Sequence, residues 1–408
     1  MCDPASSIQI GRKNKKYPGP LAAGILFSIT TIFLTYGGIL LPFKNKYLRS
    51  GLGEVLFILL PVLIFLVIGK YNIKDTLKLR KARPINYLII VFLMMFAMPV
   101  VGVLNAVALG LIRLIFGKNL PIEQIKIADM PTLFIAILVI GVSAAVCEET
   151  LFRGLISKGY ERFGVVVSLL TTSILFGILH RDIQKGVSTI LLGALIGFIV
   201  HRTKSIYCGM VAHFTNNTVV VLLTYGTTKM TENLAKMGIE QTQTLDFSNI
   251  PTASLVIVIV FYAIIFLGFA AAFIALLYAF CRSTEKEMRL EAAKVYLNET
   301  GEGSTLQLDT EIDKGNLLQP DTAIDTQLQL DAEVAETIPA QLISEEITQN
   351  QSVLISEKNR KSKFGIAGLF GVLPGLILIL LTFVGQLLEL MNVNSGIIYN
   401  LLKTLWLV

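Results

Sequence analysis

The sequence predicts an all-α protein, a polytopic bundle of transmembrane helices, on three observations. Hydrophobic residues make up 53% of the 408 residues and charged residues only 16%, whereas soluble proteins carry about 25% charged residues. The mean hydropathy is +0.67. Long apolar stretches recur along the chain, and within a bilayer only helices and closed barrels satisfy their backbone groups. We therefore expect about eight spans in a core and a ninth span after a polar linker.

The first apolar stretch, residues 21–43, follows a polar N-terminal segment with a basic cluster. It is too long for the core of a signal peptide and no small-residue cleavage site follows it, so we expect an uncleaved span. The second span, 55–69, leads into a loop at 70–86 that holds six Lys or Arg residues. Because cytoplasmic loops are rich in positive charge, both clusters predict a cytoplasmic N-terminus in the cell membrane. A weaker basic patch at 44–49 argues against this orientation.

Six further spans complete the predicted core. The third contains Pro99, which neighbouring helices can accommodate inside a membrane. In the sixth, Gly193 and Gly197 have the spacing of a close helix contact. A polar, extracytoplasmic loop is expected before the eighth. The six spans and this loop are expected at residues 87–111, 131–157, 165–181, 186–200, 205–224 and 251–280, with the loop at 225–249.

The composition changes abruptly after Arg282. Residues 283–363 are polar and largely acidic, which predicts a helical stub through Glu299 and then a disordered cytoplasmic linker. Its two Leu-Gln-Leu-Asp units are too few for a solenoid. A partner protein could bind to these units, although the simpler role of the linker is that of a spacer. A ninth span to about residue 390 and an interfacial tail follow. The chain is thus predicted to divide into initial spans with a basic loop, a catalytic core, a loop with the eighth span, the linker, and the C-terminal span: 1–130, 131–224, 225–281, 282–363 and 364–408.

Charge and cysteine content exclude other classes of protein. The net charge is only +6 and the basic residues flank apolar spans, so they indicate membrane topology and not a nucleic-acid surface. The four cysteines lie far apart without a C-x-x-C pair, so the sequence suggests neither a disulfide framework nor a structural zinc site. His201, beside Arg202 and Lys204, is expected to be a solvated loop residue.

Two adjacent glutamates, Glu148 and Glu149, lie in the fourth predicted span. Each ionised carboxylate costs about 2.5 to 3.5 kcal/mol at mid-depth in a membrane. On a helix, Glu149 and Arg153 share a face because they are one turn apart, so we expect them to form an ion pair. Glu148 is rotated by about 100° and lacks this partner. Glu149 is therefore expected to be structural and Glu148 to be a general base.

Two of the three histidines lie in predicted spans, where polar residues are candidates for function. His180 ends the fifth span, four residues after Phe176, and His213 lies in the seventh, four residues before Asn217. The rise per residue of a helix places these groups and Glu148 at overlapping depths. We expect Glu148 to face His180, His213 and Asn217 across a small polar cavity.

This cluster predicts hydrolysis of an amide bond without a cofactor, by water that Glu148 deprotonates. His213 and Asn217 are placed to donate to the developing oxyanion. A zinc site with Glu148, His180 and His213 as ligands stays open, although H-E-x-x-H is absent. Cys147 leaves a thiol nucleophile open as well. The non-enzymatic alternative is a membrane scaffold or transporter that buries these groups to hold its helices together.

Three motifs, taken in order, resemble those of the CPBP family. This family comprises the CAAX-processing and bacteriocin-processing intramembrane proteases, also called Abi proteins. The motifs are E-E-x-x-x-R at 148–153, F-x-x-x-H at 176–180 and H-x-x-x-N at 213–217. The resemblance covers about 131–224 and has no counterpart for the linker or the ninth span.

The resemblance implies an endopeptidase in the lipid bilayer that cleaves a membrane-associated, prenylated or peptide-like substrate. It favours a glutamate-activated water over a metal ion. It also leaves open an immunity protein that keeps the site and binds a peptide toxin. The residues that it implies are Glu148 and His180 for the water, His213 and Asn217 for the oxyanion, and Glu149, Arg153 and Phe176 around the site.

Overall fold

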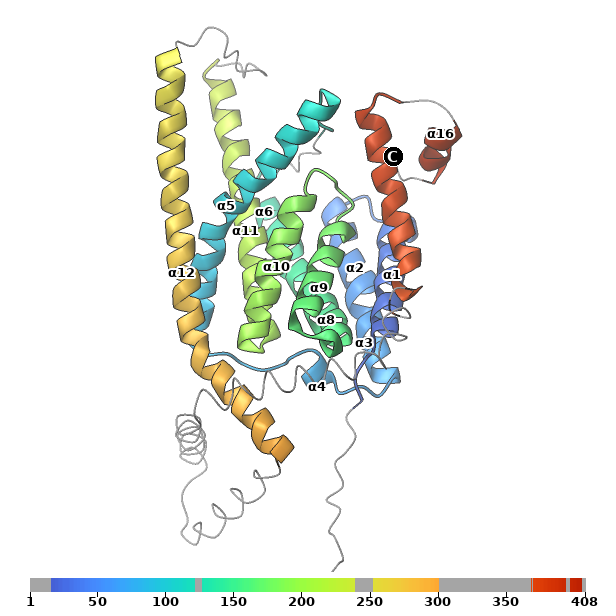
Figure 1. Cartoon of the computed structure of the whole chain (residues 1–408). Helices are drawn as coiled ribbons and strands as arrows, with labels where there is room; N and C mark the ends of the chain where they lie inside the picture. The colour runs from blue at the N-terminus through green and yellow to red at the C-terminus, as the bar shows by residue number, and fades with distance from the viewer. Residues whose placement is uncertain are drawn as a thin grey trace, which may run out of the picture.

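The chain is a multi-pass helical bundle, as predicted (Figure 1). Among the described residues, all regular structure is helical, and eight helices are long and apolar enough to cross a membrane. A ninth apolar helix, α9 (Val165–Leu179), is shorter. The computed structural model describes residues 16–121, 127–238, 252–300, 368, 370–393 and 397–405.

The first two spans bring one correction to the sequence analysis. The first is α1 (Pro20–Tyr36), extended by the short η1 (Gly37–Leu40). The second begins at Lys46 and not at residue 55, because the Asn45 side chain accepts hydrogen bonds from two backbone N–H groups and caps the helix there. Part of the basic patch at 44–49 therefore belongs to a helix. This span consists of α2 (Lys46–Glu54), the π-helical η2 (Val55–Leu59) and α3 (Leu60–Ile68).

The third and fourth spans are the longest in the first half of the chain. The short α4 (Ile73–Thr76) lies in the basic loop, and α5 (Pro84–Phe116) is the third span. The fourth runs without a break from Met130 to Phe163. It contains two π-helical segments, η3 and η4, on either side of α7. In order it consists of α6 (Met130–Ala136), η3 (Ile137–Ser143), α7 (Ala144–Glu149), η4 (Thr150–Ile156), α8 (Ser157–Tyr160) and η5 (Glu161–Phe163).

The second half of the bundle corrects two further expectations. Because α10 (Gly186–Thr203) continues past residue 200, His201 is half-buried in a helix and is not a solvated loop residue. Similarly, α11 (Ile206–Lys236) continues through about half of the predicted polar loop, where Lys229 pairs with Glu232 one turn later at 2.9 Å. The remainder of that loop from residue 239, and residues 301–367, lie outside the described residues.

The last described helices follow that gap. The eighth span and the predicted stub form one helix, α12 (Thr252–Thr300). The ninth span is the helix Phe370–Leu390, and the short α16 (Ile397–Thr404) follows it. The chain's first described residues and the end of α12 lie at the same end of the bundle (Figure 1). Below we call this the basal end.

The ninth span packs closely along α1, although more than 300 residues separate them in the chain. Ser28 Oγ donates to the carbonyl of Gly371 at 2.7 Å and accepts from the N–H of Gly375 at 3.0 Å. A Cβ atom at Gly24 would lie 2.7 Å from the carbonyl oxygen of Gly368. Small residues thus allow the two backbones to approach, as is usual between membrane helices.

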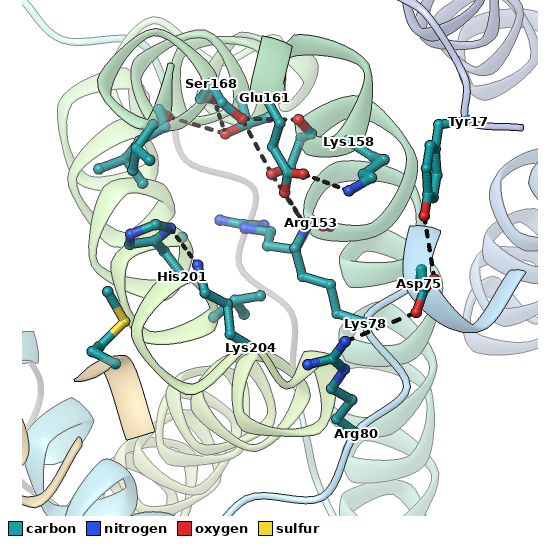
Figure 2. A pocket seen from close by; sticks show the side chains of 17 residues that line it. Tyr17, Asp75, Lys78, Arg80, Arg153, Lys158, Glu161, Ser168, His201 and Lys204 are labelled. Atoms are coloured by element: carbon teal, nitrogen blue, oxygen red, sulfur yellow. Dashed lines mark hydrogen bonds and ion pairs between the residues drawn. The ribbon is translucent and has the colours of Figure 1, made fainter. Parts of the chain in front are cut away.

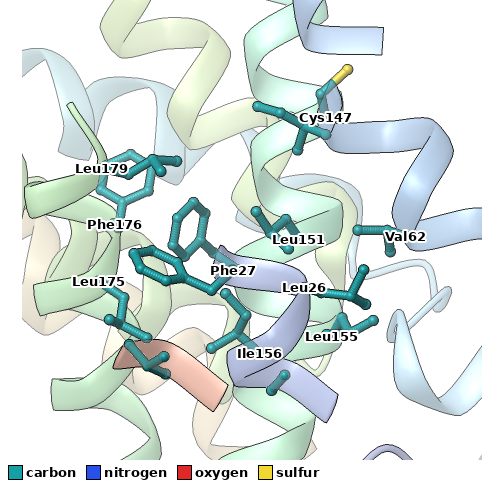
Figure 3. Close-up of a cluster of buried hydrophobic side chains, with 14 of the residues drawn as sticks. Leu26, Phe27, Val62, Cys147, Leu151, Leu155, Ile156, Leu175, Phe176 and Leu179 are labelled. Carbon is teal, nitrogen blue, oxygen red and sulfur yellow. The ribbon is translucent and has the colours of Figure 1, made fainter. Parts of the chain in front are cut away.

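The main apolar core lies between α1, the fourth span and α9 (Figure 3). Phe27 and Phe152 pack edge to face with ring centroids 6.5 Å apart, and Phe152 and Phe176 do the same at 5.2 Å. Leu151 and Leu155 are fully buried in the same cluster. This core positions η4 and α9, which carry Arg153, Phe176 and the chain leading to His180.

Candidate active site

The two glutamates lie at the C-terminal end of α7, between the π-helical segments. A π turn shifts the hydrogen-bond register by one residue and such turns are frequent at functional sites. The carbonyl of Ile140, in η3, accepts a hydrogen bond of 2.8 Å from Nδ2 of Asn217 on α11. The irregular backbone of the fourth span thus provides an anchor for one of the predicted site residues.

Glu149 is the centre of a buried polar network. Its side chain is 0% exposed and that of Arg153 is 2% exposed. Oε1 of Glu149 accepts from Arg153 at 2.8 Å, which is the expected ion pair, and from Nδ1 of His213 at 3.0 Å. Arg153 also donates to the carbonyl of Gly193 on α10 at 2.8 Å. One carboxylate and one guanidinium therefore join the fourth span to α10 and α11.

The contact with Glu149 determines how His213 presents its ring. A carboxylate can only accept, so the shared hydrogen lies on Nδ1 and Nε2 is directed elsewhere. When Nε2 also carries a hydrogen, the ring is a cation, which Glu149 stabilises. The helices approach closely here because residue 209 is glycine: a Cβ atom there would lie 2.9 Å from Oε2 of Glu149 and 2.5 Å from a methyl group of Val200.

Phe176 holds three site residues around one aromatic ring. The ring centroids of His180 and His213 lie 5.1 and 5.6 Å from that of Phe176, both edge to face. The guanidinium carbon of Arg153 lies 4.5 Å from the same centroid, within cation–π range. Phe176 therefore positions both histidines and Arg153 by packing.

His180 lies at the C-terminal end of α9 and is exposed. Its Nδ1 lies 2.9 Å from the carbonyl oxygen of Phe176. Because a carbonyl can only accept, this bond places the hydrogen on Nδ1 and leaves Nε2 of a neutral ring with its lone pair. The ring is thus held in the tautomer that accepts a proton at Nε2.

Glu148 is buried like Glu149, and Oε2 of each carboxylate has no hydrogen-bond partner among the described residues; Glu148 differs in that no arginine or histidine donates to it in the described contacts. Glu148 itself is 8% exposed. Its carboxylate repels that of Glu54, whose own Oε2 is also buried without a partner in the described chain, and attracts the guanidinium of Arg153. Glu54 was not among the predicted site residues, because the second span was expected to start one residue later. Its position as a carboxylate at the start of an apolar run could have indicated that it is buried.

Asn217 has both ends of its amide engaged. Nδ2 donates to Ile140, and Oδ1 accepts from Nδ2 of Asn216 at 3.0 Å. One N–H of Asn217 remains beyond the bond to Ile140. The structure therefore brings His213 to Glu149, a contact that the sequence did not predict. That Glu148 shares a polar cavity with His180, His213 and Asn217 stays a prediction.

The two alternative chemistries find little support in these contacts. Within the described ranges, no three His, Cys, Asp or Glu side chains lie close enough together to hold a metal ion. The zinc set of Glu148, His180 and His213 is thus not assembled in this arrangement. Cys147 is 1% exposed, and the side-chain contact of its sulfur is with Ser143 Oγ at 3.9 Å and not with a histidine that could activate it.

The comparisons with known proteins fall on this part of the chain. Residues 130–219 match the family model described as type II CAAX prenyl endopeptidase Rce1-like. This segment of the chain is similar to that family. The matched segment contains all three motifs and nearly coincides with the predicted core, 131–224, so the resemblance to CAAX-processing proteases is confirmed.

A relative among curated proteins agrees with the family match. "Putative membrane peptidase YdiL" from Bacillus subtilis (strain 168) is 24% identical over 186 residues, which cover 44% of this chain and 74% of that protein. No solved structure matches the chain. Both similarities are to peptidases.

Proposed function

We propose that the protein is an intramembrane endopeptidase in which Glu148 deprotonates the water that attacks the peptide bond. The observation that carries this proposal is the contrast between the two glutamates. Oε2 of both glutamates is buried without a partner among the described residues, but Oε1 of Glu149 accepts from Arg153 and His213, whereas no side-chain donor reaches Glu148 in the described contacts. Burying a carboxylate without a compensating group costs free energy. Such groups are concentrated at functional sites, so Glu148 is a candidate for catalysis.

In the proposed reaction, Glu148 takes a proton from water, and the hydroxide attacks the carbonyl carbon of the scissile bond. Nε2 of His180 helps to hold the water, since the bond to Phe176 keeps its lone pair free of a hydrogen. When the C–N bond breaks, Glu148 returns the proton to the leaving nitrogen, so that one carboxyl group acts first as base and then as acid.

The tetrahedral intermediate requires donors for its negative oxygen. His213 with a hydrogen on Nε2 and the second N–H of Asn217 are the proposed donors, because they lie one turn apart on α11. Glu149 and Arg153 act through His213: the carboxylate orients the ring and stabilises its cationic form. We propose no metal ion for this mechanism.

The substrate is proposed to be a peptide attached to the membrane. The family description names a prenyl endopeptidase, and the relative is named a membrane peptidase. We further propose that the protein lies in the cell membrane with its basal end in the cytoplasm, because the basic loop between α3 and α5 lies there.

The test is cleavage by the purified full chain in detergent. A prenylated CAAX peptide and the same peptide without the prenyl group are incubated with the protein, and the products are identified by mass spectrometry. Glu148→Gln is expected to lower the rate at least 10²-fold, the usual contribution of a general base. The control Glu232→Gln, at an exposed position of α11, is expected to retain the rate.

Two outcomes would contradict parts of this proposal. Wild-type cleavage by Glu148→Gln would exclude Glu148 as the base, and a wild type that cleaves neither peptide nor a wider peptide library would favour the scaffold, transporter or immunity alternatives. Loss of cleavage with a chelator, restored by zinc, would contradict the metal-free mechanism.

A further inference from the structure

A second polar site lies at the basal end of the bundle, in a cavity of about 680 Å³ (Figure 2). We call it the basal cavity. Its walls come from the N-terminal segment, the basic loop, the end of the fourth span, the first turns of α9, the last turns of α10, and α12. Of the residues assigned above to the active site, its lining includes Arg153 alone.

The lining of the basal cavity is strongly positive. Besides Arg153 it includes the four cations Lys78, Arg80, Lys158 and Lys204, against two acids, Asp75 and Glu161. Both Lys78 and Lys158 pair with Glu161, at 3.0 and 2.8 Å, so one carboxylate is shared by two ammonium groups. The contacts within the cavity therefore leave an excess of positive charge.

Two of these cations are poorly solvated. The Lys78 side chain is 11% exposed, and burial lowers the pKa of Lys78 from its ordinary value, although Glu161 opposes that shift. Arg153 is 2% exposed, and its Nε has no hydrogen-bond partner among the described residues, while its other nitrogens are used by Glu149 and Gly193. An unmade hydrogen bond of a buried donor costs about 1 to 3 kcal/mol. An acceptor atom in the cavity would recover part of that cost.

The start of α9 adds to the positive potential. Its N-cap residue, Gly164, offers no side-chain acceptor, and no acidic residue lies in its first turn. Val165 and Ser168 of this turn line the basal cavity. The unpaired N–H groups at a helix N-terminus attract anions, and here they act together with the cations.

The remaining lining points to an amphiphile. Leu169, Val200 and Met288 form an apolar part of the wall. Outside the cavity, Val166 and Val167 of α9 are exposed, at 67% and 44%, as expected for a surface that faces lipid. Basic pockets between membrane helices bind the head groups of anionic lipids, and the volume falls within the range of about 300–1,000 Å³ for small-ligand sites.

We propose that the basal cavity binds the phosphate group of an anionic phospholipid, with its acyl chains along the exposed apolar face of α9. The ammonium group of Lys158 and the first N–H groups of α9 bind the phosphate oxygens. Lys78 contributes its positive charge, because its ammonium group already contacts the Arg153 carbonyl, Ser157 and Glu161. This site does not depend on the proposed peptidase activity. It connects to the active site through Arg153, which contacts both.

The test uses the full chain in a neutral detergent and counts bound lipids by native mass spectrometry. Short-chain phosphatidylglycerol, phosphatidylcholine and inorganic phosphate are titrated separately. Phosphatidylglycerol is expected to bind at one saturable site and at least tenfold more tightly than phosphatidylcholine, whose choline cation is repelled by the lysines. Equal binding of the two lipids, or binding of inorganic phosphate alone, would overturn the proposal.

Two matched lysines make the test specific to the cavity. Lys158 and Lys229 each pair with a glutamate three residues later, at 2.8 and 2.9 Å, but Lys229 lies near the other end of α11, far from the cavity lining. Lys158→Gln is expected to weaken phosphatidylglycerol binding about fivefold, from a typical 1 kcal/mol per basic residue, and Lys229→Gln to leave it unchanged. Lys204→Gln serves if Lys158→Gln does not fold. If the cavity and control variants weakened phosphatidylglycerol binding equally, the lipid would not bind in the basal cavity.

Discussion

The two faces of α7 hold adjacent carboxylates in opposite states. Towards α10 and α11, Glu149 accepts from both Arg153 and His213. Towards α2 and η2, Glu148 meets Glu54, a group of the same charge. Most buried polar groups in native proteins are satisfied, so an unsatisfied one requires an explanation. The comparison shows that the cost of burying a carboxylate is reduced where Glu149 holds helices together, although its Oε2 also lacks a partner in the described chain, and is not reduced in this way where Glu148 is proposed to react.

The asymmetry follows from which helices pack on each face. The α11 helix reaches the fourth span through Gly209, which allows His213 to approach Glu149. On the other side, α2 ends at Glu54, directly before the π-helical η2. On this side, the contacts described above give Glu148 no hydrogen-bond donor equivalent to Arg153 or His213.

The largest effect on stability is expected on the satisfied face. Arg153→Met removes one partner of a buried ion pair and leaves Glu149 with an uncompensated charge, so the free energy of unfolding should fall by about 3 to 5 kcal/mol. The thermal midpoint in detergent measures this loss. The control Arg282→Met, which breaks the pair of Arg282 (67% exposed) with Glu285 (39% exposed), should leave the thermal midpoint nearly unchanged because solvent screens exposed pairs. Similar losses in both variants would mean that the buried pair of Glu149 and Arg153 stabilises the protein no more than the exposed pair of Arg282 and Glu285.

Exchanging each glutamate for glutamine compares the two faces directly. Glu149→Gln loses charge-assisted hydrogen bonds to Arg153 and His213, and the expected loss in unfolding free energy is about 2 kcal/mol. Glu148→Gln removes a carboxylate whose Oε2 has no partner in the described chain, so the thermal midpoint should stay the same or rise. If Glu148→Gln is destabilised more than Glu149→Gln, the claim that the Glu149 contacts contribute more to stability is wrong.

A smaller effect is expected from the close approach that creates the satisfied face. Gly209→Ala places a methyl group within 3.0 Å of Glu149 and Val200, which should cost about 1 to 3 kcal/mol through overpacking. Gly226, on the same helix, has no atom within 4 Å of its would-be Cβ, so Gly226→Ala should stabilise α11 by about 0.5 to 1 kcal/mol. Thermal midpoints of the two variants should therefore move in opposite directions; a shift in the same direction would show that packing at Gly209 is loose.

Local spacing alone was enough to predict the spans and the ion pair. Apolar runs of bilayer length determine where helices cross a membrane, and two residues one turn apart on a helix face the same side whatever surrounds them. The Glu149–Arg153 pair and the membrane-spanning order of the three motifs depend on nothing else. The ends of the helices were harder to predict from the sequence. Lys46 and Lys236 lie in polar sequence, where side-chain caps and neighbouring ion pairs, and not hydrophobicity, stabilise the helix.

The tertiary structure decided which groups from different helices meet. No spacing in the sequence relates His213 to Glu149, 64 residues away, or Glu54 to Glu148, because such contacts depend on the rotation and tilt of packed helices. The basal cavity has the same origin, since its cations come from segments scattered between residues 17 and 288. The sequence by itself thus determined the helices and the residues on each face; only their packing determined that Glu149 accepts from both Arg153 and His213 while Glu148 meets Glu54.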